Sequence, residues 1–276
     1  MSTENKIPEH KLTSITDRPF MLRHNDDGAE REHAHCFHRD NFFLIGIIIS
    51  GSQHLSVDFE KYELKAGNAI IIFPGQIHAS EPCMDTNGFA LLLSPELLID
   101  KDLLAIRELQ FGNKIIELKE NDLHDIIQLY NVLKKRHQTA REIELSLVNA
   151  IKHMVIANIT PNHPSVPNRY IRLVLKFQQL MEQNIRTVKS PTEYASMLNV
   201  SGVYLNEAVK SVTGKNASCL IGEYVTMLAK RELCYTKLSA QEIAFRLGYE
   251  DYSYFSRLFS RHASMSPKRF REIYIK

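Results

Sequence analysis

The sequence predicts an α+β protein of two domains: an antiparallel β-barrel with a helical hairpin, followed by an all-α domain built on a repeated pair of helices. Three observations predict this order. Short β-prone runs separated by glycine and proline turns come first, two amphipathic stretches follow, and a duplicated helix-capping pattern lies near the C-terminus. The 276 residues are enough for two domains of ordinary size.

A proline-rich segment marks the predicted domain boundary. It reads TPNHPSVPN, with three prolines and no apolar periodicity, so we expect a semi-extended linker. The predicted first domain therefore covers residues 1–159, the linker 160–168 and the second domain 169–276.

Charge is distributed unevenly about this boundary, although the whole chain has a net charge of only +2. Residues 1–168 carry 17 basic and 23 acidic side chains, a net charge of −6. The remaining residues carry 17 basic and 9 acidic side chains, a net charge of +8. A basic domain favours nucleic acid as its partner, but a basic surface without a partner accounts for the charge alone equally well.

Composition excludes several classes of protein. The chain is 44% hydrophobic and 24% charged, which is typical of a folded protein and not of a disordered or collagen-like one. Its longest apolar run, Phe42–Ile49, is far too short to span a bilayer, and no apolar segment follows the first residues. Four scattered cysteines without a CxxC pair fit a reducing compartment. We expect a cytoplasmic protein with no membrane contact.

The strands of the first domain are expected between residues 39 and 93. Phe42–Ile49 is a continuous β-prone run, which predicts a strand buried on both faces. Leu55, Val57 and Phe59 alternate with polar residues, as in a half-buried strand. Further short runs follow, separated by Gly/Pro turns, and this spacing favours a sandwich or a barrel.

Two amphipathic helices are predicted at residues 122–137 and 142–159. Their apolar stripes recur at spacings of three and four; the stripe residues are Leu123, Ile126, Ile127, Tyr130 and Leu133 in the first helix and Ile143, Leu147, Ile151 and Val155 in the second. Such a pair could cap the core of the β domain or form a homodimer interface, and both uses stay open because they can share residues.

The basic second domain contains an internal duplication. Ser190-Pro-Thr-Glu193 and Ser239-Ala-Gln-Glu242 both have the S-x-x-E form of a capping box, which begins a helix. After each short helix the pattern breaks, and a second capping residue follows, Ser201 in one copy and Asp251 in the other. A short helix, a turn and a capped helix make a helix-turn-helix unit, and here the pattern occurs twice.

The polar faces of the two capped helices are the predicted DNA-reading surfaces. Arginine suits guanine, asparagine suits adenine, glutamate accepts from cytosine and an apolar side chain meets a thymine methyl. The candidate base contacts are Val203, Asn206, Glu207, Tyr252, Ser253, Ser256 and Arg257. The candidate phosphate contacts, which position the protein, are Ser201, Lys210, Ser260 and Arg261.

Residues 184–274 resemble the AraC/XylS family of bacterial transcription regulators. The resemblance is strongest in the run AQEIAFRLGYEDYSYFSRLF at 240–259 and in the closing MSPKRFR at 265–271. It implies tandem helix-turn-helix units joined by a central helix at 218–235, with the recognition helices entering successive major grooves of promoter DNA about 34 Å apart. RNA polymerase is a further candidate partner. The chain is expected to act as an activator, but the sequence leaves activation and repression of transcription both open. The sequence departs from the family at Ser260, where lysine is usual, and at Ser264, where glycine is usual.

Histidines in the first domain resemble those of the cupin-like sensor domain that precedes many such regulators. His33-Ala-His35-Cys-Phe-His38 is followed later by Gly67-x6-Pro74-Gly75-x2-His78. Imidazoles from neighbouring strands suit a metal ion, but the glutamate usual in a metal cupin is missing and Asp40 is the only nearby carboxylate. We therefore predict no metal and no cofactor, and a small-molecule effector pocket with His35, His38 and His78 as its polar groups.

The sequence thus predicts a regulator that is not an enzyme and that binds double-stranded DNA under the control of an effector. The alternative is a metal-dependent cupin enzyme fused to a DNA-binding domain. Metal analysis of the purified protein separates the two.

Overall fold

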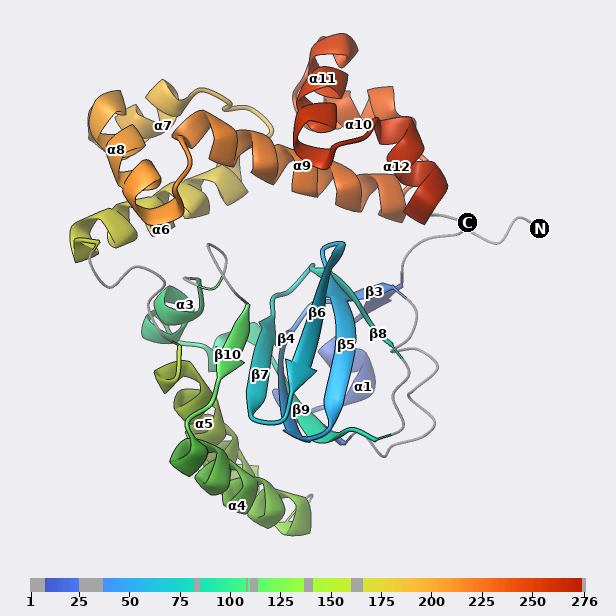
Figure 1. Cartoon of the computed structure of the whole chain (residues 1–276), viewed down its shortest axis with the longest axis vertical. Helices are drawn as coiled ribbons and strands as arrows, with labels where there is room; N and C mark the ends of the chain where they lie inside the picture. The colour runs from blue at the N-terminus through green and yellow to red at the C-terminus, as the bar shows by residue number, and fades with distance from the viewer. Residues whose placement is uncertain are drawn as a thin grey trace. The chain divides into compact units, whose positions relative to one another are not determined.

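Figure 1 shows the computed structural model of the chain, which describes residues 8–24, 37–81, 85–107, 109, 114–136, 141–159 and 166–274. The chain divides into two compact units, one of residues 8–162 and one that begins at residue 163. Of the predicted linker at 160–168, residues 160–165 lie outside the described residues.

Two five-stranded sheets form the N-terminal unit. The first has the order β1-β3-β8-β5-β6 and the second the order β10-β7-β4-β9-β2. The strands are β1 (Glu9–His10), β2 (Phe20–His24), β3 (His38–Asp40), β4 (Phe43–Ser50), β5 (Ser52–Val57), β6 (Glu60–Lys65), β7 (Asn68–Ile72), β8 (Ile77–Ser80), β9 (Asn87–Leu93) and β10 (Ile115–Glu117). Every described pairing is antiparallel except the parallel pairing of β1 with β3. The predicted antiparallel β domain is confirmed.

Strand β4 contributes to two hydrophobic cores. Ile45 and Ile47 belong to a core that includes residues from the helices, whereas Ile48 packs with Leu55 and Val57 of β5 in the other sheet. The predicted burial of β4 on both of its faces is therefore confirmed. The inner faces of the two sheets meet at the second of these cores.

Helical elements cover the first of the two cores. They are the 3-10 turn η2 (Pro95–Leu97), α3 (Asp100–Arg107), α4 (Glu120–Arg136) and α5 (Arg141–Ala157). The short helix α1 (Leu12–Ile15) instead packs Leu12 against Phe42 and Leu92 in a separate cluster. Ile126 and Leu133 of α4 and Ile151 of α5 are buried in the same cluster as the strand residues, so the helix pair caps the core. The stripe predicted for α5 was wrong at Ile143, which is 44% exposed. Glu144, the next residue, is the one that is buried at this end of the helix.

Helix α5 carries two buried charges, and each has a partner. The carboxylate of Glu144 accepts a hydrogen bond from the guanidinium of Arg18. Lys152, which is 2% exposed, donates to Asp102 Oδ2 of α3 at 2.7 Å and to the backbone oxygen of Leu97 at 2.7 Å. Removing either partner would leave a buried charge unpaired, so these pairs fix how α5 docks.

The C-terminal unit is wholly helical in its described part. Its helices are α6 (Asn168–Asn184), α7 (Pro191–Met197), α8 (Gly202–Thr213), α9 (Ala217–Tyr235), α10 (Ala240–Arg246), α11 (Tyr252–Ala263) and α12 (Pro267–Tyr274). The central helix expected at 218–235 is α9, against which α8 and α11 both pack. Among the described residues, no helix combines the length and the hydropathy that a membrane span requires.

Candidate nucleic-acid interface

Two helix-turn-helix units in the C-terminal part share one backbone plan. In the first unit, the short helix α7 is followed by a turn at Asn199, whose φ of 56° is left-handed, and then by α8. In the second unit, α10 is followed by a turn at Gly248, with a φ of 81°, and then by α11. The short helices have 7 residues each and the following helices 12 residues each.

The second helix of each unit begins at the predicted capping residue. The Ser201 hydroxyl accepts a hydrogen bond from the backbone N–H of Tyr204 at 3.1 Å. The Asp251 carboxylate accepts one from the N–H of Ser253 at 2.7 Å. Both caps satisfy an N–H group that the helix itself leaves without a partner.

The two predicted capping boxes have different outcomes. Ser239 and Glu242 form the complete box, with the serine oxygen accepting at 3.2 Å and the carboxylate accepting from the Ser239 N–H at 2.7 Å. The box predicted at Ser190 was wrong, because that side chain makes no capping hydrogen bond. Two other features fix the start of α7 there. Pro191 occupies its first turn, and the fully buried Tyr194 donates its hydroxyl to the backbone oxygen of Val188 at 3.0 Å.

The outward face of α8 presents one large apolar side chain and two polar side chains with partners inside the protein. Val203 is 81% exposed, and Lys210 is also exposed. The Asn206 side-chain oxygen accepts from the N–H of Ala217 at 3.0 Å, and the Glu207 carboxylate accepts from the Tyr170 hydroxyl at 2.8 Å. Both side chains are exposed, but one acceptor atom of each is already in use.

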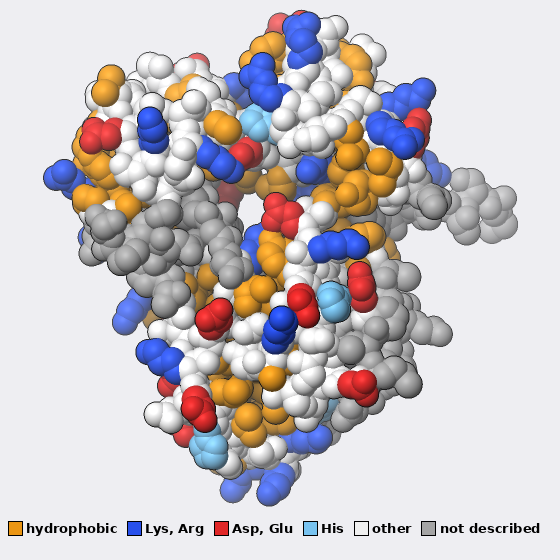
Figure 2. Space-filling view, viewed as in Figure 1, with side chains coloured by type: hydrophobic (Ala, Val, Ile, Leu, Met, Phe, Trp, Pro, Cys, Tyr) orange, Lys and Arg blue, Asp and Glu red, His pale blue; other side chains and the backbone are white. Residues whose placement is uncertain are grey.

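The outward face of α11 is more basic than that of α8. Arg257 and Arg261 are exposed, and neither makes a hydrogen bond or ion pair with another residue in the described part of the chain. Ser253 is exposed, while Tyr252, Ser256 and Ser260 are half-buried. Figure 2 shows Lys and Arg side chains over α11 at the top of the view.

A tyrosine that the sequence reasoning did not single out belongs to the same helix. Tyr254 is 53% exposed, and its ring stacks on that of Tyr249 with a centroid separation of 6.0 Å. Its place in the first turn of α11, where recognition helices meet bases, was a signal that could have identified it.

The two helix-turn-helix units lie close together at the turn between α10 and α11. A Cβ on Gly248 would overlap the backbone oxygen of Arg186, which precedes α7, so the two backbones approach as closely as glycine allows. Beside this contact, Lys189 Nζ lies 5.1 Å from the centre of the Tyr249 ring. Burial lowers the pKa of Lys189 and raises that of Tyr249 to about 12.

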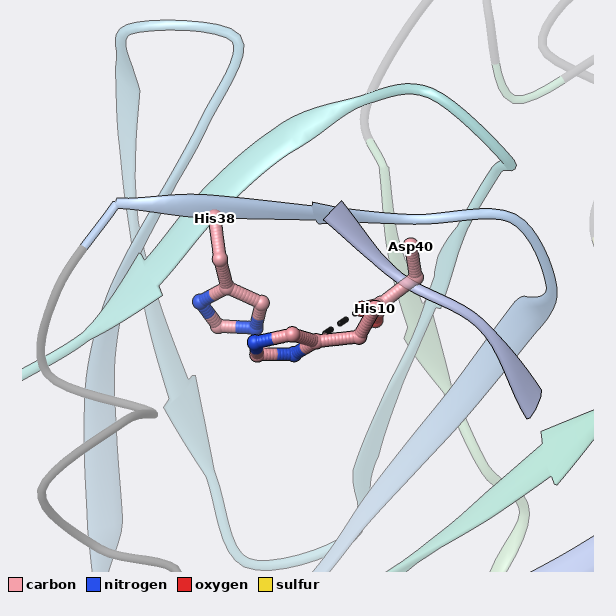
Figure 3. A group of neighbouring side chains, drawn as sticks. All are labelled: His10, His38 and Asp40. Atoms are coloured by element: carbon pink, nitrogen blue, oxygen red, sulfur yellow. Dashed lines mark ion pairs between the residues drawn. The ribbon is translucent and has the colours of Figure 1, made fainter. Parts of the chain in front are cut away.

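Polar side chains also gather in the N-terminal unit, on the sheet that contains β3. His38 and His78, two of the predicted pocket residues, are 4% and 5% exposed, and their ring centroids lie 4.2 Å apart. The third, His35, lies outside the described residues. His10 and Asp40 join them, as Figure 3 shows for His10, His38 and Asp40. Sequence reasoning missed His10, because a strand of two residues leaves no recognisable pattern.

Comparison with known protein families assigns both units. The model of an AraC-like ligand binding domain matches residues 27–145, and that of a helix-turn-helix domain matches residues 194–273. The chain belongs to the AraC/XylS family of transcriptional regulators. A search of the curated proteins finds no significant match.

Solved structures of other AraC-type proteins are similar at low identity. ToxT from Vibrio cholerae is 12% identical, with a TM-score of 0.44 over 94% of this chain and 100% of that chain. The C-terminal domain of the response regulator AraT from Geobacillus stearothermophilus is 29% identical, with a TM-score of 0.35 over 37% of this chain and 84% of that one. A transcriptional regulator from Chromobacterium violaceum is 23% identical, with a TM-score of 0.37 over 40% and 98%.

One departure from the AraC-type pattern has a visible structural effect. Ser264, where glycine is usual in the family, ends α11 in the left-handed conformation with a φ of 57°. Gly214 ends α8 in the same conformation with a φ of 72°. The helix therefore ends as it would with glycine, and the serine bears the conformational cost.

Proposed function

We propose that this AraC-type regulator acts in the cytoplasm and places α8 and α11 in successive major grooves of promoter DNA. The observation that supports this most is the pair of capped helices, each buried on one face and polar on the other. Leu205 and Val209 anchor α8 in the core, and Phe255 and Phe259 anchor α11. Two such helices reach grooves about 34 Å apart on one side of the duplex.

The proposed base contacts divide between the two helices by chemistry. The guanidinium of Arg257 has no hydrogen-bond or ion-pair partner among the described residues, so it is available for bidentate binding of guanine. Val203 suits a thymine methyl, and Asn206 keeps its amide N–H donors. The full proposed set is Val203, Asn206, Glu207, Tyr252, Ser253, Ser256 and Arg257.

The proposed phosphate contacts flank these residues. Lys210 and Arg261 supply charge, and Ser201 and Ser260 supply hydroxyl donors. Ser201 also accepts the capping bond with its oxygen, which leaves its hydrogen for a phosphate. Such contacts position the protein without reading sequence.

The N-terminal unit is proposed to bind a small-molecule effector and to form a homodimer. The polar groups proposed for the effector are His35, His38 and His78. The dimer is proposed to form through residues 122–159, where Val132 of α4 and Ile143 of α5 are 42% and 44% exposed. Analytical ultracentrifugation tests it: replacing both side chains by aspartate should give monomers, and an unchanged dimer would refute this interface.

We infer that the protein performs no catalysis and that it activates transcription through contact with RNA polymerase. Transcription of a bound promoter in a purified system tests this activation. An increase in transcript on addition of the protein supports it, and a decrease identifies a repressor.

DNA binding is tested with promoter fragments recovered from a genomic pull-down. The dissociation constant is measured over a range of salt concentrations for the wild type and for the variants Arg257→Ala, Lys210→Ala and Lys176→Ala. Lys176 is the matched control, because it is an exposed cation on α6, which is not one of the two helices proposed to enter the major groove.

The expected outcomes differ between the variants. Arg257→Ala should cost about 1–3 kcal/mol of binding free energy and relax specificity at one base pair. Lys210→Ala should weaken binding to all sequences alike and reduce the salt slope by about one, while Lys176→Ala changes little. If Arg257→Ala weakens binding to every sequence equally, Arg257 contacts phosphate and its assignment to a base is wrong.

A further inference from the structure

Four side chains of the N-terminal unit converge because of the strand register. His38 and Asp40 are two residues apart on β3, so they point to the same face of the sheet. His78 on β8 is the direct partner of His38, and His10 on β1 is the direct partner of Asp40. Three adjacent strands therefore bring three imidazoles and one carboxylate together, and we call these four residues the His/Asp cluster. Figure 3 shows His10, His38 and Asp40 of this cluster.

The distances within the His/Asp cluster are those of groups around one point. The ring centroids of His10 and His38 lie 4.9 Å apart, and the ligand atoms of His10, His38 and Asp40 all lie within 4.8 Å of one another. His78 joins this group through Asp40 and through its ring contact with His38, so its side chain must move closer to complete a four-ligand site. His10 Nδ1 is 3.5 Å from Asp40 Oδ1, and His78 Nε2 is 3.3 Å from Asp40 Oδ2. Bonds of about 2.0–2.2 Å to a central ion place ligand atoms about 3–4 Å apart, so a small contraction suffices.

Two polar atoms of the His/Asp cluster lack a hydrogen bond in the described part of the chain. Asp40 Oδ1 and His78 Nε2 are buried and have no hydrogen-bond partner among the described residues. Asp40 is 3% exposed and His78 is 5% exposed, so bulk water does not compensate. A buried polar atom without a partner destabilises a fold by about 1–3 kcal/mol, and a cation between these two atoms would satisfy both.

The hydrogen bond on the far side of His78 orients this ring as a ligand. Its Nδ1 lies 3.2 Å from the backbone oxygen of Gln76, and a carbonyl can only accept, so Nδ1 carries the proton. In a neutral imidazole, Nε2 then has its lone pair free and directed at the carboxylate. Metal-binding histidines characteristically donate their other N–H in this way.

The residue that supplies this carbonyl is itself held in place. Gln76 accepts from the N–H of Phe73 at 2.7 Å and donates to Asp58 Oδ2 at 2.7 Å. These bonds fix the backbone that orients His78, which is the second layer of support that a preorganised site requires.

We propose that His10, His38, Asp40 and His78 bind one divalent transition-metal ion. Three imidazole nitrogens and one carboxylate oxygen suit Zn²⁺, Fe²⁺, Co²⁺, Ni²⁺ or Mn²⁺, and not Ca²⁺ or Mg²⁺, which prefer all-oxygen sites. This proposal differs from the metal-free effector pocket expected from the sequence, because His38 and His78 would then hold the ion. It goes beyond the proposed function and does not depend on it, since metal binding is measured without DNA.

The test uses full-length protein produced without a polyhistidine tag and treated with a chelator. Calorimetric titration with Zn²⁺ should give one ion per chain, and Co²⁺ should produce visible ligand-field bands that Zn²⁺ abolishes. His10→Ala and His78→Ala should each weaken Zn²⁺ binding by more than about 100-fold, because loss of a mere second-layer partner already costs 10–100-fold. His10 is the less buried of the two, so its variant is the safer one to fold.

Two control variants locate the ion. His54→Ala removes an exposed histidine of β5 in the same sheet and should leave binding unchanged. Cys219→Ala disrupts Cys219, Glu223 and His262, the other described group close enough to hold an ion, and should also leave it unchanged. Circular dichroism establishes that each variant is folded, and only the variants with an intact His/Asp cluster should gain thermal stability from Zn²⁺.

Several results would overturn the proposal. One is the absence of Zn²⁺ binding by the wild type. Another is unchanged affinity in a folded His10→Ala variant, and a third is loss of binding in Cys219→Ala alone. If His78→Ala does not fold, His10→Ala with the Co²⁺ spectrum still decides.

Discussion

The two helix-turn-helix units reach the same backbone conformation with different residues. At the turn, the first unit uses Asn199 and the second uses Gly248, both with positive φ. At the end of the second helix the order is reversed, with Gly214 in the first unit and Ser264 in the second. The duplicated feature is therefore the conformation, while the residue at each position depends on what surrounds it.

The two helix-turn-helix units differ most in whether the side chains on the outward faces of α8 and α11 are bonded to other residues of the protein. Polar groups on α8 are bonded inside the protein, through Tyr170 to Glu207 and Ala217 to Asn206. The cations on α11 have no such partners in the described chain. We infer that the second unit supplies most of the electrostatic attraction to DNA, and that the first unit is the better ordered of the two faces before binding.

The largest predicted effect concerns the turn glycine of the second unit. Gly248→Ala should lower the free energy of unfolding by about 3 kcal/mol or more, because the new Cβ overlaps Arg186 and alanine disfavours positive φ. Urea denaturation followed by circular dichroism measures it. Gly214→Ala is the control: its φ is similar but the space around it is open, so it should cost only about 1 kcal/mol. Equal costs would mean that the contact with Arg186 contributes nothing.

A smaller difference is expected between the two serines that precede the short helices. Ser239→Ala removes a complete capping box and should destabilise the unit by about 1 kcal/mol. Ser190→Ala removes no capping bond and should change stability by about 0.3 kcal/mol or less. Denaturant midpoints of the two variants test the contrast, and a cost at Ser190 as large as that at Ser239 would contradict it.

Substitution at the end of α11 should stabilise the protein. Ser264→Gly removes the strain of a serine in the left-handed conformation, which should raise the free energy of unfolding by about 0.5–1 kcal/mol. The greater conformational freedom of glycine in the unfolded chain reduces this gain. The reverse change in the first unit, Gly214→Ser, should destabilise by a similar amount. Thermal unfolding of both variants decides, and a loss of stability in Ser264→Gly would show that the serine is not strained.

The smallest effect is a pH dependence confined to the second unit. His262 lies where the first unit has the buried Val212, and a Cβ on Gly222 of α9 would overlap its ring. Burial lowers the pKa of His262 below its ordinary value of about 6.5. The folded protein thus binds this proton less readily than the unfolded chain. Its contribution to stability is complete above about pH 6.5 and declines as the pH falls through that value.

The variant His262→Gln should remove this part of the pH dependence. Denaturant midpoints of the variant and the wild type are compared at about pH 8 and about pH 5.5. The stability of the wild type relative to the variant should be greater at the higher pH. A difference that does not change with pH would show that His262 does not contribute.

Much of this architecture follows from local sequence patterns. Apolar alternation, helical periodicity and the caps at Ser201 and Asp251 depend on neighbouring residues, so the sequence predicts them. The structure confirms the two caps and most of the alternation and periodicity. The exceptions are Phe59, which lies in the left-handed turn after β5, and the exposed Ile143. The features that were missed depend on distant residues. The buried Tyr194 fixes the start of α7, where a capping box at Ser190 was expected. The parallel pairing of β1 brings His10 to Asp40, and no local pattern encodes it.

The close approach of Gly248 to Arg186 has a consequence for the DNA that this protein recognises. Because the two helix-turn-helix units meet backbone to backbone at this point, we infer that α8 and α11 keep a fixed orientation relative to each other. B-DNA turns once in about 10.5 base pairs, so inserting five base pairs between the two recognised elements would carry one of them to the opposite side of the duplex. An operator for this regulator must therefore keep a fixed helical phase, and changes in its spacing are as disruptive as changes in its bases.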